Sequence, residues 1–189
     1  MPSRAEEIRV AALGLFARLG YEATTMADIG AAVGIRGPSL YKHVASKQDL
    51  LAAVMTGTMR ELLALHREAV ATTDDPAERL RRATEAHVRY HAGHRLEAFV
   101  GNREIRSLVP SNRRRVLSLR AEYEKCFRDL VHAGITAGRF HVMSARLASY
   151  AILDLGMGVA VWFRADGELT EDIVTWQYGE MALRIVGAT

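Results

Sequence analysis

Side chains that can hydrogen-bond DNA are concentrated in one short stretch near the N-terminus. Residues 37–44 are predicted to form a short helix, and Arg36 lies immediately before it. Ser39, Lys42 and His43 lie on this helix. Guanidinium, ammonium, hydroxyl and imidazole groups can donate to phosphate oxygens and to acceptors on base edges. This stretch is therefore a candidate contact with double-stranded DNA.

A second short helix precedes the first and completes the candidate site. A Thr-Met-Ala-Asp capping box at residues 25–28 predicts that this helix starts at Thr25, and Gly34 ends it. Two short helices joined by a tight turn form a helix-turn-helix, whose second helix enters the major groove. The helix starts at Thr25 and Gly37 could also receive phosphates on their backbone N–H groups.

Residues 24–47, TTMADIGAAVGIRGPSLYKHVASK, resemble the signature of the tetracycline-repressor (TetR) family. The resemblance implies an operator-binding protein in which Thr25, Tyr41 and Lys47 bind phosphates. It also implies that the residues before the Leu-Tyr pair read bases: Arg36, Gly37 and Ser39, with Lys42 alongside. His43 completes the predicted DNA-binding set. The open alternatives are that Tyr41 is a core residue and that Lys42 and His43 are ordinary solvated residues.

Three positions depart from the family pattern. Arg36 stands where a small polar residue is usual, Pro38 where Gly is frequent, and Val44 where Phe is usual. These changes alter the expected operator sequence but not the DNA-binding role. Residues 1–47 carry a net charge of only +2. We therefore expect that the N-terminal DNA-binding parts of two subunits must bind one two-fold site together to reach a sufficient affinity for DNA.

The remaining sequence predicts helices throughout and no strand of useful length. Apolar residues at helical spacing and N-terminal caps predict about nine helices in an all-α fold. In the helix capped by Asp75, the side chain of Glu78 is expected to reach back and accept a hydrogen bond from the backbone N–H of Asp75. We predict two domains: a helix-turn-helix DNA-binding domain of residues 1–47 and a ligand-binding and dimerisation domain of residues 48–189. The predicted helices after the head are 47–70, 76–91, 94–108, 110 to 134 or 138, 145–163 and 171–186.

The last two predicted helices combine apolar and small residues that allow close packing. Such helices could pair with those of a second copy as a four-helix bundle, and the resemblance implies a homodimer of this kind. The alternative is that both helices belong only to the core. The predicted dimer residues are Ala151, Leu155, Val159, Trp176, Gly179 and Ile185.

An effector site is predicted in the second domain. Aromatic residues and methionines from several helices could line an apolar cavity, and nearby arginines could bind phosphates. With its REIRSL and LRAEYE runs and the VWFRADGELT between the last two helices, the helical domain resembles family members that respond to acyl-coenzyme A thioesters of lipid or sterol catabolism. A member that senses an apolar drug-like molecule and controls efflux is the alternative, as is a core with a solvated basic face. The predicted ligand residues are Phe99, Asn102, Arg103, Arg106, Tyr123, Phe127, Met157 and Trp162, with Met143 and Arg113–Arg115 nearby.

Other kinds of chemistry find little support in the sequence. His87, His91 and His94 have a spacing that metal ligands can use, but Gly93 interrupts their helix, so a histidine cluster without metal is predicted. Nucleophile elbow, phosphate loop, dinucleotide fingerprint and HExxH motifs are absent, which predicts neither an enzyme nor a cofactor.

The composition favours a cytoplasmic protein. One cysteine, Cys126, excludes an internal disulfide and fits a reducing compartment. We find no secretion signal. The most apolar run, residues 151–163, contains Asp154 and is predicted to be too short to cross a bilayer.

Overall fold

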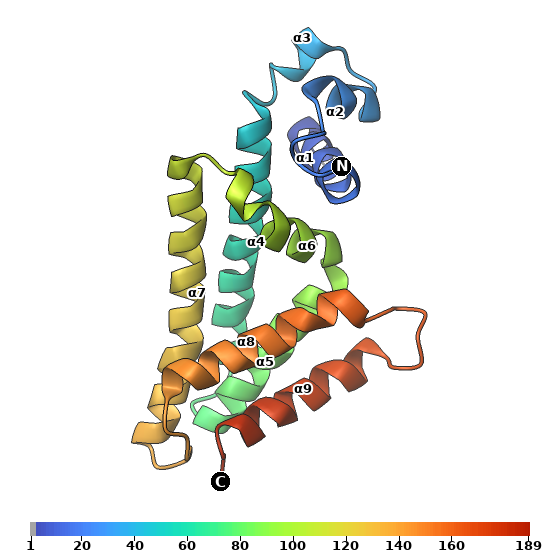
Figure 1. Cartoon of the computed structure of the whole chain (residues 1–189). Helices are drawn as coiled ribbons and strands as arrows, with labels where there is room; N and C mark the ends of the chain where they lie inside the picture. Colours follow the sequence, from blue (N-terminus) through green and yellow to red (C-terminus); the bar gives the residue numbers. More distant parts are fainter. Residues whose placement is uncertain (1–2) are drawn as a thin grey trace. The chain divides into compact units, whose positions relative to one another are not determined.

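The computed structural model describes residues 3–189, and in these residues it contains nine α-helices, one 3-10 helix and no strand (Figure 1). This confirms the predicted all-α fold. The helices are α1 (Arg4–Leu19), α2 (Met26–Ala32), α3 (Gly37–Leu40), α4 (Lys47–Val70), α5 (Pro76–Gly93), α6 (Arg95–Arg103), the 3-10 helix η1 (Glu104–Ser107), α7 (Pro110–Thr136), α8 (Ala145–Trp162) and α9 (Glu171–Ile185).

Side-chain caps set most of the helix starts at the predicted positions. The Thr25 hydroxyl accepts from the backbone N–H of Asp28, and the Asp28 carboxylate accepts from that of Thr25, so α2 starts with a complete capping box. Ser46 caps α4 by accepting from the backbone N–H of Asp49 at 3.1 Å. Equivalent contacts cap α5, α8 and α9 through Asp75, Ser144 and Thr170.

Three local predictions are corrected by the structure. Glu78 does not reach back to the cap of α5, because its carboxylate accepts from the guanidinium groups of Arg81 and Arg82. α3 ends at Leu40 rather than Val44, and residues 41–43 form a turn. The predicted helix 94–108 is divided, because the tighter η1 follows α6 after Arg103.

The first of two compact units comprises Met1–Met59 and Leu96–Ser118 and is named unit 1. Its core joins the helix-turn-helix to α4, α6 and the start of α7. Because the apolar side of each short helix is fixed in this core, the helices have a defined orientation although each is too short to be stable alone. The largest fully buried residues of the core are Ile8, Phe16, Ile29, Leu40, Leu51, Val54, Val100 and Val116.

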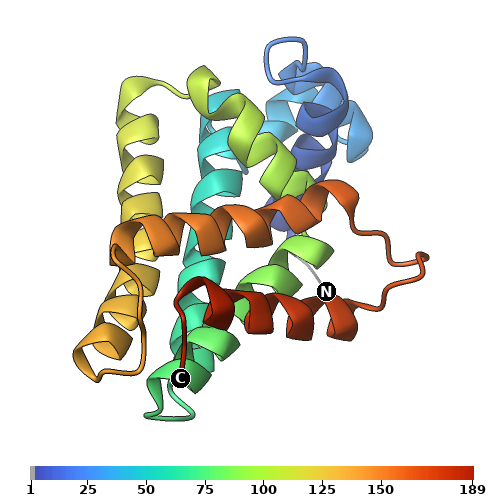
Figure 2. The same cartoon turned by 60° about the horizontal axis from the view of Figure 1, so that its bottom comes forward.

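Unit 2 comprises Arg60–Arg95 and Leu119–Thr189. In this unit α8 and α9 run in opposite directions and both pack on α5 (Figures 1 and 2). The Arg89 guanidinium fastens α5 to the start of α9 by donating to Glu171 at 2.7 Å and Asp172 at 2.9 Å. α4 and α7 contribute residues to both units. The division at residue 47 into DNA-binding and ligand-binding domains stays a prediction.

Candidate DNA-binding and effector-binding sites

The turn between α2 and α3 is built around two backbone features. Gly34 has a φ of +69°, a conformation that glycine adopts without steric cost. The backbone N–H of Ile35 then donates to the carbonyl of Gly30 at 2.9 Å and closes the turn. Ile29 and Leu40 are fully buried and hold one side of each helix in the core. The opposite sides of both helices are therefore available to a partner.

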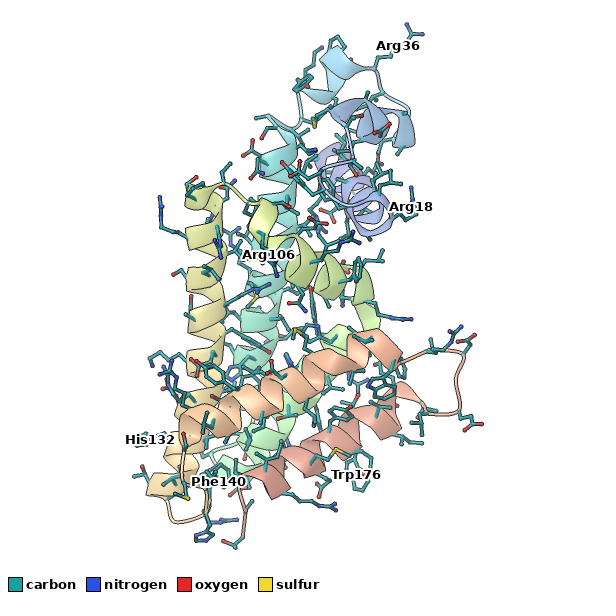
Figure 3. The ribbon with its side chains drawn as sticks, viewed as in Figure 1. Arg18, Arg36, Arg106, His132, Phe140 and Trp176 are labelled. Atoms are coloured by element: carbon teal, nitrogen blue, oxygen red, sulfur yellow. The ribbon has the colours of Figure 1, made fainter. Side chains whose placement is uncertain are left out.

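The predicted base-reading residues lie together on this available side. Arg36, Ser39, Tyr41, Lys42 and His43 are all exposed. Figure 3 shows Arg36 extending outward from the helix-turn-helix. None of the five side chains forms a hydrogen bond or ion pair with another residue of the described part of the chain. Their donors are therefore available for phosphates or base edges, and Gly37, the remaining residue of this predicted set, begins α3.

Tyr41 is 56% exposed, although tyrosine is a large apolar residue. This exposure argues against the alternative that Tyr41 is a core residue. Its backbone belongs to the turn that follows α3, where the N–H of His43 donates to the carbonyl of Leu40 at 3.0 Å. The turn carries the Tyr41 ring and hydroxyl outward, as a phosphate contact requires.

Thr25 has a structural task in addition to its predicted contact with phosphate. Its hydroxyl accepts from the Asp28 N–H and also donates to the Asp28 carboxylate at 2.7 Å. Hydrogen bonds from Thr25 lower the pKa of Asp28, so a negative charge lies beside the first turn of α2. Phosphate binding by Thr25 stays a prediction.

Lys47 makes structural contacts that the phosphate prediction does not include. Its ammonium group donates to the carbonyl oxygens of Tyr21 and Thr24, both at 2.8 Å, and of Glu22 at 3.3 Å. It also lies 4.3 Å from the centre of the Tyr21 ring. An ammonium group has three N–H donors, and all three are used inside unit 1. The Lys47 side chain therefore fixes the α1–α2 turn, and phosphate binding by Lys47 stays a prediction.

Gln48, which sequence reasoning missed, links the turn between α1 and α2 to η1 and to the residue before α7. Its amide group donates to the Tyr21 hydroxyl at 2.7 Å and to the Ser107 carbonyl at 2.6 Å. Its amide oxygen accepts from the Val109 N–H at 3.0 Å. Buried Glu104 adds a second link, because its carboxylate accepts from the backbone N–H of Tyr21 at 3.3 Å. No local sequence signal marks these contacts, which join residues 27 or more positions apart.

The predicted ligand residues divide between the two units. Phe99, Asn102, Arg103 and Arg106 belong to unit 1, as do Arg113–Arg115; Tyr123, Phe127, Met157 and Trp162 belong to unit 2. The five arginines therefore share a unit with the helix-turn-helix, which brings the net charge of unit 1 to +4 and leaves unit 2 at −1. Met143 is fully exposed and does not line an interior. Trp162 is also largely at the surface.

Unit 2 encloses a cluster of imidazole and aromatic rings that includes two of the predicted ligand residues. Tyr123 and Phe127 of α7 are buried, and their rings lie 5.4 Å apart. His87 of α5 contacts both rings, and His66 of α4 lies 5.3 Å from the ring of Phe127. His91 packs on His87 at 4.5 Å. We name these five residues the imidazole cluster; its member His66 was not singled out from the sequence.

The hydrogen bonds of His87 fix its protonation. Its Nε2 lies 3.0 Å from the carbonyl oxygen of Leu153, which can only accept, so Nε2 carries the proton. Nδ1 is then an acceptor, and the Tyr123 hydroxyl donates to it at 3.1 Å. Burial lowers the pKa of His87 to about 4, the Leu153 carbonyl opposes this shift, and nearby His66 adds to it. His87 is thus neutral at neutral pH.

The histidine series 87, 91 and 94 is not gathered around a common metal position. His94 instead stacks on Tyr90, with ring centres 4.1 Å apart, and its Nδ1 lies 2.9 Å from the Tyr90 carbonyl. Within residues 3–189 we find no group of three or more His, Cys, Asp or Glu side chains placed to hold a metal ion. Cys126 is partly buried, and burial raises the pKa of its thiol, which does not favour a nucleophile.

α8 and α9 expose an apolar face on unit 2. Ala151 and Leu155 of α8 and Trp176 of α9, three of the predicted dimer residues, are exposed, and Figure 3 shows Trp176 projecting from α9. Val159 and Gly179 do not belong to this face: Val159 lies in the core with Val88, and Gly179 packs on Arg81 and Glu85 of α5. Ile185 is partly buried. Further exposed apolar residues are Leu147, Val161, Ile173 and Met181.

By length and composition alone, α8 could cross a membrane. The structure thus corrects the prediction that this run is too short, because the helix includes residues 145–150 as well. Core helices of globular proteins also meet this criterion. Here α8 packs on α5 along one side, and its Ser149 hydroxyl donates to Glu124 of α7. Intramolecular packing and an exposed candidate interface account for the composition of α8.

Both parts of the chain match the profiles of known protein families. Residues 8–54 match the family profile described as bacterial regulatory proteins, tetR family. Residues 73–186 match the profile of the tetracyclin repressor-like C-terminal domain. The chain belongs to the TetR family. It is accordingly a DNA-binding transcriptional regulator and not an enzyme.

Individual members of the TetR family are similar over the whole chain. The HTH-type transcriptional repressor KstR2 of Rhodococcus jostii (strain RHA1) is 32% identical over 183 residues, covering 95% of this chain and 89% of KstR2. A solved TetR-family regulatory protein from Rhodococcus RHA1 is 34% identical, with a TM-score of 0.92 and full coverage of both chains.

Two further solved structures are similar over nearly the whole chain. The ketosteroid transcriptional regulator KstR2 of Mycobacterium tuberculosis is 28% identical, with a TM-score of 0.88 over 100% of this chain and 96% of that one. AibR, solved in complex with isovaleryl coenzyme A and operator DNA, has a TM-score of 0.85 over 99% of this chain and 100% of AibR. At 23% identity, the likeness to AibR shows the fold alone.

Proposed function

We propose that this TetR-family regulator is a repressor that binds a two-fold operator as a homodimer and is released by an acyl-coenzyme A thioester of lipid or sterol catabolism. The observation that carries the DNA-binding part is the helix-turn-helix surface. There Arg36, Ser39, Tyr41, Lys42 and His43 are exposed together, and no described residue pairs with their side chains. Two copies of this surface would match the two half-sites of the operator.

The apolar face of α8 and α9 supports the homodimer. Trp176 is 52% exposed and Leu155 is 40% exposed. Burial of either apolar side chain would lower the free energy of the protein. Large aromatic residues at the centre of such a patch are typical anchors of protein interfaces. A two-fold pairing of the α8–α9 faces would bury them and form a four-helix bundle.

The effector part of the proposal is supported by charge and by the relatives. Arg103, Arg106 and Arg113–Arg115 are partners of the kind that the phosphates of coenzyme A require. AibR was solved with an acyl-coenzyme A and operator DNA, and the KstR2 structure is that of a ketosteroid regulator. A thioester can release the DNA only if it binds the free dimer more tightly than the DNA-bound dimer.

Operator binding is tested by gel shift with DNA from upstream of the chain's own coding sequence, at several salt concentrations. We expect salt-sensitive binding of two subunits to one two-fold site. Arg36→Ala should weaken binding to the preferred operator by about ten- to a hundredfold and change the base preference. Tyr41→Ala should weaken binding to all sequences alike. Arg18→Ala is the matched control, because Arg18 is exposed on α1 in the same unit.

Three results would contradict the proposal. Absence of salt-sensitive DNA binding by the wild type would exclude the proposed binding to an operator. If Arg36→Ala and Tyr41→Ala each weaken binding equally on every DNA sequence, Arg36 does not take part in base recognition. For the effector, isovaleryl coenzyme A and longer acyl thioesters are added to the complex, with free coenzyme A as control. Release by an apolar drug-like molecule but by no thioester would favour the alternative of an efflux regulator.

A further inference from the structure

The imidazole cluster contains two buried nitrogen atoms that no protein group satisfies. His66 is 6% exposed and His91 is 4% exposed. His66 Nε2 and His91 Nδ1 have no hydrogen-bond partner in the part of the chain that the structure describes. Buried polar groups are normally paired, because an unpaired one loses its hydrogen bonds to water without replacement. The pairing of His87 with Tyr123 and Leu153 shows the normal arrangement within the same cluster.

The surroundings of these two histidines keep them uncharged. Burial lowers the pKa of His66 to about 4, and the positive charge of Arg79 on α5 adds to this effect. Burial lowers the pKa of His91 to about 3, with further contributions from His87 and His94. At neutral pH each ring therefore offers one N–H donor and one lone pair. A neutral ring of this kind hydrogen-bonds an uncharged oxygen without taking up a proton.

Most other neighbours of the two histidines are aromatic rings, and the positive charge of Arg79 on α5 also acts on His66. The Phe127 and Tyr123 rings of α7 lie beside His66, and the Tyr90 ring lies 5.5 Å from that of His91. On the side of α8, Gly156 packs against His87 so closely that an added Cβ would lie 2.4 Å from the ring. Aromatic neighbours of this kind favour a hydrocarbon skeleton, and the two unpaired nitrogens are the kind of polar group that orients a ligand among apolar side chains.

We propose that His66 and His91 are the hydrogen-bond partners of an uncharged oxygen, keto or hydroxyl, carried by the apolar part of the effector. This inference rests on the proposed ligand response and narrows its chemistry to oxygenated hydrocarbons. A fully saturated, oxygen-free acyl group would leave both nitrogens unpaired. The regulator would therefore distinguish an oxygenated effector from its oxygen-free counterpart by the difference in hydrogen bonding.

The test uses two probes with the same bicyclic skeleton: α-tetralone, which has a keto oxygen, and tetralin, which has none. Binding to the full-length protein is followed by NMR of the histidine ring nitrogens. We expect α-tetralone to bind about tenfold more tightly than tetralin, as one or two net hydrogen bonds imply. It should shift the ring nitrogens of His66 and His91 but not those of exposed His132 on α7.

Substitution by phenylalanine separates a ligand contact from a structural role. His66→Phe and His91→Phe should each reduce the preference for α-tetralone over tetralin to about threefold or less. His132→Phe, the matched control, should retain it. Because the unpaired nitrogens contribute no hydrogen bond to the folded protein, the two cluster variants should unfold at the wild-type temperature or above it.

Several outcomes would overturn the inference. The inference is wrong if the wild type binds both probes equally or binds neither of them. It is also wrong if both cluster variants retain the preference for the ketone, or if tetralin carboxylate binds more tightly than α-tetralone. The proposed function fails separately. If thioesters release the operator while the ketone preference is absent, only the inference is wrong. If the ketone preference holds but no thioester acts, only the proposed effector class is wrong.

Discussion

Replacing Lys47 by methionine distinguishes its observed structural contacts from the phosphate contact that family resemblance implies. The substitution preserves most of the aliphatic chain but removes the three hydrogen bonds to the carbonyls of Tyr21, Glu22 and Thr24. A hydrogen bond from a charged donor contributes about 1.5–3 kcal/mol when buried. Because Lys47 is partly exposed and water can replace some of these bonds, we expect a total loss of about 2–3 kcal/mol in the free energy of unfolding.

The assay combines unfolding with the salt dependence of operator binding. A loss of this size should lower the Tm of a chain of this length by about 5–10 °C. The slope of log K against log salt is negative, and a lysine that binds phosphate contributes about one to its magnitude. Removal of such a lysine therefore makes the slope less steep. We expect Lys47→Met to lower the Tm and leave the slope unchanged. Lys42→Met is the matched control, since loss of exposed Lys42 should make the slope less steep without affecting the Tm.

The reverse pattern would refute this reasoning. If Lys47→Met leaves the Tm unchanged but makes the slope less steep by about one per subunit, the ammonium binds phosphate and the carbonyl contacts do not persist in the complex. Arginine at position 47 provides a further check. It retains the charge, but its planar group cannot place three donors around the same point. A structural role therefore predicts that Lys47→Arg is also destabilised.

Three further predictions concern unit 2. Trp176→Glu should weaken dimerisation by about a hundredfold or more in sedimentation equilibrium, because it places a charge in the proposed apolar interface; an unchanged dimer would exclude that face. Gly156→Ala should destabilise the protein by about 1–3 kcal/mol in urea unfolding, because the added methyl group overlaps the His87 ring; a wild-type unfolding midpoint would count against the tight packing. Arg81 and Arg82 lower the pKa of Glu78 from 4.5 to about 2, so its ion pairs stabilise the fold above pH 4.5 and this stabilisation is lost as the pH falls to about 2. The stability difference between wild type and Glu78→Gln should shrink over that interval, and a difference that stays constant would contradict the assignment.

Local signals in the sequence were sufficient to predict most of the helices. The cap at Thr25 and the Asp75-Pro76 pair each involve residues within one helical turn, and both define helix starts in the structure. Where several partners compete nearby, the local rule failed. The Glu78 carboxylate was expected at the cap, but arginines three and four positions later lie on the same side of α5 and bind it instead.

The candidate sites were predictable only where the family signature covers them. The exposed residues from Arg36 to His43 follow from that signature. The task of Lys47 does not, because it depends on carbonyls more than twenty positions earlier that approach only when α1 packs beside α4. Likewise the spacing of His87 and His91 was visible along α5, whereas His66 joins them from another helix. Helical periodicity carries no information on such distant pairs.

One continuous helix carries a residue from each of the two sites. α4 begins with Lys47 and Gln48, which hold Tyr21 and the turn before α2, and His66 of the imidazole cluster lies near its other end. Gln48 also accepts from Val109, immediately before α7, and α7 continues to Tyr123 and Phe127 of the same cluster. An effector oxygen bound to His66 would thus act on a helix whose first turn fixes the DNA-binding head. The coupling between effector and operator is then limited by how differently the cluster binds the oxygen in the free and the DNA-bound dimer. By reciprocity, operator DNA must weaken effector binding by the same factor.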